Sequence, residues 1–485
     1  MRTGLHEVAT THSPESLAES LRGEPGVVLL HSAGFESRQA RYSLVTARPF
    51  LTLRSFGPRC ELRSTHGRRV LTANPWALLA GLLARYELPG EADLPFPLGG
   101  CFGYWGYELK NFVEPKLPRR AVNDLALPDC QLGFYDSLVV FDHQLAKAWI
   151  ISTGLREDGS RSEPLARQRS DFWRDRLSAE VRLADDAPRA SRPVSRVTSS
   201  LSRAGFLSAV GRARGYIRAG DIYQVNLSHR LAARPAPSGW ELYRRLAAAS
   251  PAPFAAYLDA GDFQIASSSP ELFLRLSGAH IITRPIKGTR PRSADPTRDA
   301  QLAYELQTSP KENAELVMIT DLLRNDLGRV CEFGSVQVPD LMRLERFAQV
   351  QHLVSTVEGR LRPDLTHLDA LAACFPGGSI TGAPKIRAME IIDKLEPVAR
   401  GPYTGALGYL GFNRESQFSI LIRTAICRGG AAYFPVGAGI VADSVPEAEY
   451  EETLAKAAGF LAALARQLEP TLPRKSALPR LGFRI

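Results

Sequence analysis

The sequence predicts a large α+β protein, and three observations support this fold class. Its 485 residues are 44% apolar, which is enough to bury a substantial core. Short apolar runs typical of strands occur in both halves of the chain. Amphipathic patterns typical of helices lie between these runs. The composition therefore excludes a chain that is disordered throughout.

Residues 1–154 are predicted to form a β-rich N-terminal domain that contains one helix, at Pro75–Tyr86. Its strands are predicted at Val27–Leu30, Arg41–Thr46, Ser137–Phe141 and Ala148–Ser152. Residues 155–200 are rich in arginine, serine, aspartate and proline, which indicates a polar surface connector. Within it, one short helix is expected at Asp171–Leu183.

A second domain is expected over residues 201–470, followed by a C-terminal tail at 471–485. Its helices are predicted at Gly205–Ala219, Pro310–Leu327, Lys385–Leu395 and Glu447–Leu468. Its strands are predicted at Tyr223–Leu231, Phe254–Asp259, Phe263–Ser267, Tyr403–Phe412 and Phe418–Cys427.

Cysteine usage and apolar patterning indicate a cytoplasmic protein. The six cysteines lie far apart with no CxxC pair, which fits a reducing compartment and no zinc or iron–sulfur site. The first residues, MRTGLHEVAT, lack the apolar stretch of a signal peptide, and no run of about eighteen apolar residues predicts a membrane span. The net charge is +9, but the arginines are spread along the chain, so no nucleic-acid partner is expected.

Two predicted helices carry glutamate pairs that can bind a metal ion. Glu312 and Glu315 are three residues apart, as are Glu449 and Glu452, so each pair lies on one helical face. Four carboxylates from two helices can present the oxygen ligands that Mg²⁺ prefers. Spacing alone also fits two ordinary solvated faces.

Glycine-rich segments provide candidate anion-binding turns. The run FPGGSITGAPK (375–385) precedes a helix, and VGAGIVADS (436–444) precedes the second acidic helix. Backbone N–H groups in such turns can hold a carboxylate or phosphate, although each also fits an ordinary loop. Arg423 stands among apolar residues, where an unpaired guanidinium is costly, so an acidic partner is expected.

Lys287, in RPIKGTRPR (284–292), is a candidate nucleophile. It follows an extended run and a proline, which places it near a strand end beside Gly288. A partly desolvated lysine can lose its proton and attack an electrophile. The alternative is a solvated loop lysine.

Together these segments resemble the chorismate-utilising family that contains anthranilate synthase component I, aminodeoxychorismate synthase component I and the isochorismate and salicylate synthases. The motifs are GDIYQVNLS (220–228), ASSSPELFL (266–274), PIKGTRPR (285–292), KENAELVMITDLLRNDLGRV (311–330), QHLVS (351–355), GGSITGAPK (377–385), ILIRTA (420–425) and GAGIVADSVPEAEYEETLAKA (437–457). A looser similarity includes GGCFGYWGYEL (99–109). The resemblance implies antiparallel β-sheets packed face to face with helices outside, and interlocked N- and C-terminal parts.

Two positions discriminate within this family. Gln224 stands where the isochorismate and salicylate synthases have a lysine that activates water, so the resemblance implies a member that uses ammonia. Lys287 gives PIKGT, typical of aminodeoxychorismate synthases, where anthranilate synthases usually show PIAGT. We therefore expect amination of chorismate at C4 to 4-amino-4-deoxychorismate, for 4-aminobenzoate and folate synthesis. Anthranilate is the alternative product, and a non-catalytic chorismate-binding scaffold subunit is a distant alternative.

The resemblance also implies residue roles. Lys287 attacks C2 of chorismate while the C4 hydroxyl leaves with a proton from Glu271, and Thr381 and His352 line the ring. Mg²⁺ is held by the four helical glutamates. The substrate is contacted by Gln224, Tyr409, Arg423, Gly437, Ala438, Gly439 and Lys456. No glutaminase domain follows the cysteine of GGCFGYW, so a separate glutaminase subunit is the expected source of ammonia.

Overall fold

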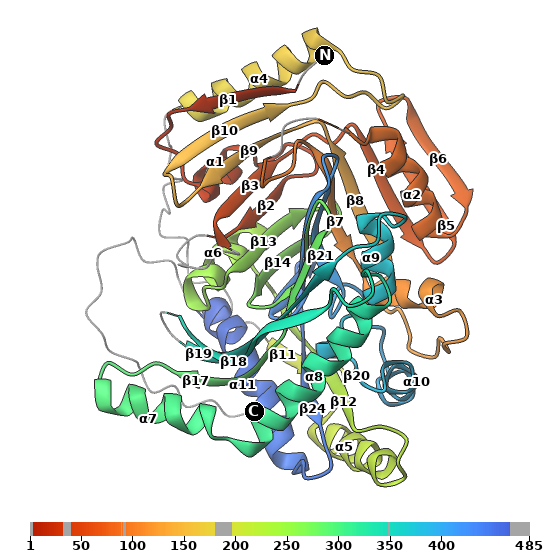
Figure 1. The fold of residues 1–485 in the computed structure, drawn as a ribbon, viewed down its shortest axis with the longest axis vertical. Coiled ribbons are helices and arrows are strands. Elements are labelled where there is room, and N and C mark those ends of the chain that lie inside the picture. The colour runs from red at the N-terminus through yellow and green to blue at the C-terminus, as the bar shows by residue number, and fades with distance from the viewer. Residues whose placement is uncertain are drawn as a thin grey trace.

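The computed structural model describes residues 3–32, 40–88, 90, 94–179, 196–347 and 350–465, whose strands form two antiparallel 12-stranded sheets (Figure 1). The largest cluster of buried side chains takes residues from both sheets, including Leu138 and Ile265 of one sheet and Phe134 and Phe418 of the other. The sheets therefore pack face to face, and the predicted α+β fold is confirmed.

The first sheet has the strand order β1–β10–β9–β3–β2–β13–β14–β23–β24–β12–β11, with the short β20 paired to β12. Its strands are β1 (Gly4–Val8), β2 (Val28–His31), β3 (Tyr42–Thr46), β9 (Ser137–Asp142), β10 (Lys147–Ser152), β11 (Arg196–Ser199), β12 (Gln224–Arg234), β13 (Phe254–Asp259), β14 (Gln264–Ser269), β20 (Gly382–Ala383), β23 (Thr424–Arg428) and β24 (Ala431–Ile440).

The second sheet has the order β17–β19–β16–β15–β22–β21–β7–β8–β4–β5–β6, with β18 paired to β19. Its strands are β4 (Leu51–Phe56), β5 (Arg59–Ser64), β6 (Gly67–Thr72), β7 (Gly100–Trp105), β8 (Cys130–Tyr135), β15 (Leu272–Ser277), β16 (His280–Arg284), β17 (Ile286–Pro291), β18 (Gln337–Arg346), β19 (Val350–Arg360), β21 (Ala406–Gly411) and β22 (Glu415–Ile420).

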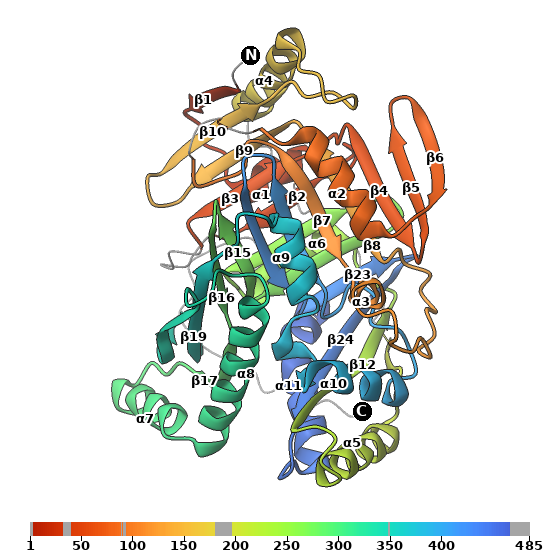
Figure 2. The same cartoon turned by 45° about the vertical axis from the view of Figure 1, so that its right-hand side comes forward.

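Helices lie around the paired sheets (Figure 2). They are α1 (Pro14–Ser20), α2 (Pro75–Tyr86), α3 (Lys110–Val113), α4 (Glu163–Ser178), α5 (Arg203–Arg218), α6 (Gly239–Ala249), α7 (Pro296–Gln307), α8 (Pro310–Gly328), α9 (His367–Cys374), α10 (Lys385–Leu395) and α11 (Pro446–Ala465). None of the helices within these described ranges is long and apolar enough to cross a membrane. All six cysteines lie in the described residues, where they are buried and form no disulfide.

Both sheets cross the domain boundary expected near residue 200. In the first sheet β2 pairs with β13, and in the second β7 pairs with β21, so each sheet takes strands from both halves of the chain. Residues 1–154 and 201–470 are therefore interlocked in space, and the expected boundary divides the sequence without dividing the fold.

The polar connector expected over residues 155–200 is wrong for its first part, because helix α4 packs onto the first sheet. Trp173 of α4 is fully buried beside Val139 and Ile150, and its indole N–H donates to the Ser137 hydroxyl at 3.1 Å. Figure 1 shows α4 running along the outside of β10. Residues 180–195, in the later part of the connector, and the tail at 471–485 lie outside the described residues.

The single strand predicted over Phe418–Cys427 is two strands in different sheets. β22 ends at Ile420, and β23 begins at Thr424 in the opposite sheet. Between them Arg423 has a φ of 50°, a left-handed conformation that non-glycine residues rarely adopt. The chain thus crosses from one sheet to the other at the predicted functional arginine.

Candidate functional site

The two acidic helices approach each other at their N-terminal turns. Lys311, in the first turn of α8, lies 3.7 Å through its Nζ from the Oε1 of Glu449 on α11. Charge interactions connect Glu315 to Glu312 on its own helix and to Glu452 on α11. The four predicted metal-binding glutamates are therefore electrostatic neighbours.

Burial and mutual repulsion raise the pKa of two glutamates in this cluster. Burial is the main cause that raises the pKa of Glu315 and of Glu449, and the charge of Glu452 raises both further. Glu449 is 3% exposed; its Oε1 accepts a hydrogen bond from the Ser444 hydroxyl at 2.6 Å, and its Oε2 has no hydrogen-bond partner among the described residues. Such an orphaned buried carboxylate oxygen is costly unless a cation or donor binds it.

Three lysines lie among the glutamates: Lys287 and Lys456, which the sequence analysis placed in the site, and Lys311, which it missed. The charges of Lys287 and Lys311 both act on Glu315, and Lys456 lies 2.7 Å from Glu452. In this conformation no three acidic, histidine or cysteine side chains of the described residues converge closely enough to enclose a metal ion. The oxygen-rich donor set nevertheless fits Mg²⁺ chemically, since hard cations bind carboxylates.

Lys287 is the second residue of β17 and lies inside the strand, where it pairs with Leu353 of β19. The next residue, Gly288, has a φ of 66° and marks a bulge in the pairing. A Cβ at Gly288 would lie 3.1 Å from the Glu312 Oε2, so this glycine lets the strand approach α8 closely. The bulge therefore holds Lys287 beside the acidic helices.

Glu271, between β14 and β15, is a buried carboxyl group that interacts electrostatically with Lys287. It is 6% exposed, and burial raises its pKa to about 7, against the lowering effects of a hydrogen bond with Ser379 and the charges of Lys287 and Lys456. A carboxyl group with this pKa can donate a proton near neutral pH. Burial thus supplies the raised pKa that the sequence-based interpretation required.

His352 and Thr381 are both buried, with hydrogen bonds that orient them. The His352 Nδ1 lies 2.9 Å from the Thr289 hydroxyl oxygen, and burial, together with the charge of Arg423, lowers the histidine pKa to about 4. The imidazole is therefore neutral at pH 7. The Thr381 hydroxyl donates to the carbonyl of Gly377, with an oxygen–oxygen distance of 3.0 Å.

The acidic partner expected for Arg423 is not a carboxylate among the described residues. Burial lowers the pKa of its guanidinium, and among the described residues no carboxylate lies within ion-pair distance of it. A buried guanidinium without a counter-charge is costly unless an anion binds. The lack of a described protein carboxylate beside the Arg423 guanidinium is consistent with binding of a ligand carboxylate there.

The segment from Gly437 to Gly439, including the fully buried Ala438, lies on β24 opposite β12. β23 pairs with β24 only as far as Tyr433, so among the described strands this segment has a neighbour on one edge alone. The Lys456 Nζ donates to the Gly437 carbonyl at 2.9 Å. The predicted backbone amides therefore lie next to a predicted lysine at a strand edge.

Gln224, the first residue of β12, points its amide at Gly439. A Cβ on Gly439 would lie 2.7 Å from the Gln224 Nε2, so the glutamine amide lies directly beside this glycine. Gln224 is fully buried, and neither its Oε1 nor its Nε2 has a hydrogen-bond partner among the described residues. An amide with both ends unsatisfied indicates space for a polar ligand or water.

The predicted substrate contact of Tyr409 is wrong, because this side chain lies in the core. Tyr403 lies beside the Gly437–Gly439 segment instead. The Tyr409 ring stacks on Phe102 at 5.3 Å between centroids, inside the core between the sheets. The Tyr403 hydroxyl, by contrast, would lie 3.0 Å from a Cβ at Gly437. Both tyrosines stand in the run GPYTGALGY (401–409), and the turn before β21 turns the first of them toward the site.

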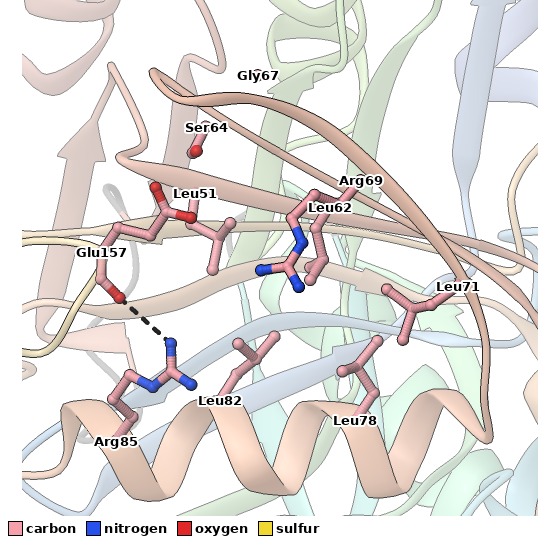
Figure 3. A pocket seen from close by; sticks show the side chains of 10 residues that line it. All are labelled: Leu51, Leu62, Ser64, Gly67, Arg69, Leu71, Leu78, Leu82, Arg85 and Glu157. Carbon is pink, nitrogen blue, oxygen red and sulfur yellow. Dashed lines mark hydrogen bonds between the residues drawn. The ribbon is translucent and has the colours of Figure 1, made fainter.

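A separate pocket lies between α2 and the β4–β5–β6 hairpins (Figure 3). Leucines line it, among them Leu51, Leu62 and Leu82, and the Arg85 guanidinium faces the backbone carbonyl of Glu157 at 3.5 Å. It contains none of the predicted site residues. The cluster around Lys287 and Glu271 is therefore the stronger candidate for catalysis.

Comparisons with known proteins identify the family of the chain. Anthranilate synthase component 1 of Acetivibrio thermocellus is 40% identical over 463 residues, covering 94% of this chain and 93% of the relative. Aminodeoxychorismate synthase component 1 of Klebsiella aerogenes is 41% identical over 438 residues, covering 90% of this chain and 93% of the relative. The crystal structure of anthranilate synthase component I from Streptococcus pneumoniae TIGR4 matches with a TM-score of 0.76 and 32% identity, covering 88% of this chain and 93% of that one. The family model described as chorismate binding enzyme matches residues 35–462, and the chain belongs to this family of chorismate-utilising enzymes.

Proposed function

We propose that the protein aminates chorismate at C4 to 4-amino-4-deoxychorismate through a covalent intermediate on Lys287. The observation that carries this proposal is the position of Lys287, which interacts electrostatically with the buried Glu271 and with Glu315 and Glu452. A lysine nucleophile and a carboxylic acid with a pKa near neutrality are the two groups that the reaction needs.

The proposed reaction has two substitution steps. In the first, the Lys287 amine forms a bond to C2 of chorismate, both conjugated ring double bonds shift, and the C4–O bond breaks as Glu271 donates its proton to the departing hydroxyl, which leaves as water. In the second, ammonia forms a bond to C4, both double bonds shift back, and the C2–N bond breaks to return the lysine, while the new ammonium group returns a proton to the Glu271 carboxylate. Two allylic displacements replace one difficult substitution.

The remaining residues bind and orient the substrate in this proposal. Arg423 and the Gly437–Gly439 edge hold carboxylates, and the neutral His352 and the buried Thr381 line the ring. The glutamates of α8 and α11 would hold Mg²⁺, which when bound neutralises a substrate carboxylate and withdraws electron density from the ring. The unpartnered Gln224 amide lies at the position where family members that use water carry a lysine, which supports ammonia as the nucleophile.

Ammonia is proposed to come from a partner glutaminase subunit. The relatives carry "component 1" in their names, which supports a two-component enzyme. We also propose that the protein acts in the cytoplasm, in 4-aminobenzoate and folate synthesis. Anthranilate synthesis is the second candidate, because relatives with that name are as similar, at 40% identity, as those named aminodeoxychorismate synthase, at 41%.

Product identity decides between these functions. The pure chain is incubated with chorismate, Mg²⁺ and ammonium salt, with and without an aminodeoxychorismate lyase, and the products are identified by mass spectrometry. We expect a product that retains its pyruvyl group and yields 4-aminobenzoate only with the lyase. Direct release of fluorescent anthranilate and pyruvate would establish the second candidate, and no turnover would favour a scaffold subunit.

Removal of divalent cations is expected to abolish turnover, because the proposed Mg²⁺ neutralises a substrate carboxylate and withdraws electron density from the ring. The activity should return when Mg²⁺ is added back after EDTA treatment.

Glu449→Gln should raise the Mg²⁺ dissociation constant measured by calorimetry by about tenfold or more, since it removes a charged oxygen ligand. As a matched control, Glu451→Gln on the exposed side of α11 should leave Mg²⁺ binding unchanged. Full activity in EDTA would exclude a metal role.

A further inference from the structure

A buried, fully hydrogen-bonded ion pair lies next to segments that carry candidate site residues. Arg400 and Glu396, just after α10, have side chains that are 2% and 3% exposed and are joined by two hydrogen bonds of 2.6 and 2.8 Å. The arginine makes three more, to the carbonyls of Ile380 (3.0 Å) and Asn226 (2.7 Å) and to the Thr404 hydroxyl (3.2 Å). All five of its N–H donors are therefore satisfied.

The partners of this pair belong to three segments that line the site. Ile380 immediately precedes Thr381, and Thr404 immediately follows Tyr403. The third segment is β12, where Asn226 pairs with Gly439.

The glutamate fixes the same strand at a second point. Its Oε1 accepts from the backbone N–H and the hydroxyl of Ser228, at 2.8 and 2.9 Å, and Ser228 pairs with Gly437. The ion pair thus holds the strand opposite both glycines of the proposed carboxylate-binding edge.

The motif GGCFGYWGYEL (99–109) binds the turn that contains Arg400 and Gly401. The Glu108 carboxylate accepts hydrogen bonds from the backbone N–H groups of Arg400 and Gly401, at 3.1 and 2.9 Å. The Tyr107 ring lies 4.7 Å from the Arg400 guanidinium, measured to the ring centroid, and 4.4 Å from the Lys110 Nζ. The N-terminal half of the chain therefore anchors the turn that carries Tyr403.

We propose that the Arg400–Glu396 ion pair is a positioning device that sets the distance between β12, the Thr381 segment and the Tyr403 turn, and thereby the geometry with which the enzyme binds a chorismate carboxylate. The proposal rests on the proposed use of chorismate. Because both side chains are almost fully buried, they act through these segments and do not contact the substrate. Contacts to a non-reacting carboxylate are equally strong in the ground state and the transition state. Their loss therefore raises KM and leaves kcat unchanged.

The double variant Arg400→Met/Glu396→Leu separates positioning from stability. Replacing a buried ion pair with apolar residues of similar volume is often neutral or stabilising, whereas breaking it by a single substitution leaves a buried charge. We expect a thermal midpoint close to that of the wild type, a KM for chorismate raised about tenfold, and a kcat within about threefold of the wild-type value. Ser228→Ala, which removes a single hydrogen bond to Glu396, should raise KM by about twofold to fivefold.

The matched control is Arg387→Met/Glu390→Leu, an ion pair on α10 whose side chains are 34% and 35% exposed. It should leave KM unchanged. An unchanged KM in a folded Arg400→Met/Glu396→Leu variant would overturn the proposal, as would a lower kcat alone, which reports only a smaller active fraction.

Two further outcomes are also decisive. If the double variant does not fold, the KM of Ser228→Ala decides in its place, and a wild-type value would refute positioning. If the wild type does not consume chorismate, the proposed function fails. The dissociation constant for chorismate, measured by calorimetry, then tests positioning by itself: it should rise about tenfold in the double variant, and an equal constant would refute the inference.

Discussion

Replacing Lys287 with alanine is expected to lower the rate of C4 amination on the order of 10³-fold, because the direct displacement by ammonia must then proceed without a covalent intermediate. The fold should survive, since Lys287 is only half-buried, in a strand held by its pairing with β19. Chorismate consumption and product formation are followed by mass spectrometry in saturating ammonium salt.

Lys287→Arg is the matched control, since it keeps a positive charge near Glu271, Glu315 and Glu452 but provides no nucleophile. If Lys287 acts by its charge alone, the arginine variant should retain most of the activity, and this result would contradict covalent catalysis. If it acts as a nucleophile, both variants should be equally slow. Intact-mass measurement during turnover should then show a chorismate-derived adduct on the wild type and none on either variant.

Glu271→Gln is expected to lower kcat by about 10² to 10⁴, the usual contribution of a general acid. The wild-type rate should also fall as pH rises through about 7, because burial raises the pKa of Glu271 to about 7 and only the protonated form donates. This descending limb should be absent from the residual activity of the glutamine variant. The measurement is kcat/KM against pH between about 5.5 and about 9, because kcat/KM reports the pKa values of the free enzyme.

Glu108 requires a separate control, because burial also raises its pKa to about 7. Glu108→Gln should keep the descending limb if Glu271 is the acid, and loss of the limb in this variant would reassign it. Both carboxyl groups also affect stability. Each binds its proton more tightly in the folded state than at its ordinary pKa of 4.5, so the free energy of unfolding should decrease as pH rises from 4.5 to about 7.

Helices and strands whose ends depend on neighbouring residues could be predicted from the sequence. Helices Pro75–Tyr86 and Lys385–Leu395 and strand Phe254–Asp259 begin and end where predicted. The first helix shows why: the Asn74 side chain accepts from the Trp76 N–H, and Pro75 starts the helix. The glutamate pairs of α8 and α11 were predictable for the same reason, since helical spacing fixes which side chains share a face.

Features that depend on distant parts of the chain could not be predicted in this way. The apolar run through Leu421 and Ile422 continues the strand pattern, so the change of sheet at Arg423 has no local signal. Tyr403 and Tyr409 stand in one short run, and only the turn before β21 decides which of them faces the site. Lys311 was missed because its interaction with Glu449 joins two helices that are far apart in sequence.

The shared sheets also determine when this protein can fold during its synthesis. Trp105 of β7 pairs with Ala406 of β21, and His31 of β2 pairs with Ala255 of β13. Strands β2 and β7 therefore each keep one edge unpaired during synthesis, β7 until residues near 406 have emerged from the ribosome. Contacts between such distant residues slow folding and expose the waiting edges to aggregation. Expression of the first 154 residues alone should accordingly yield insoluble protein.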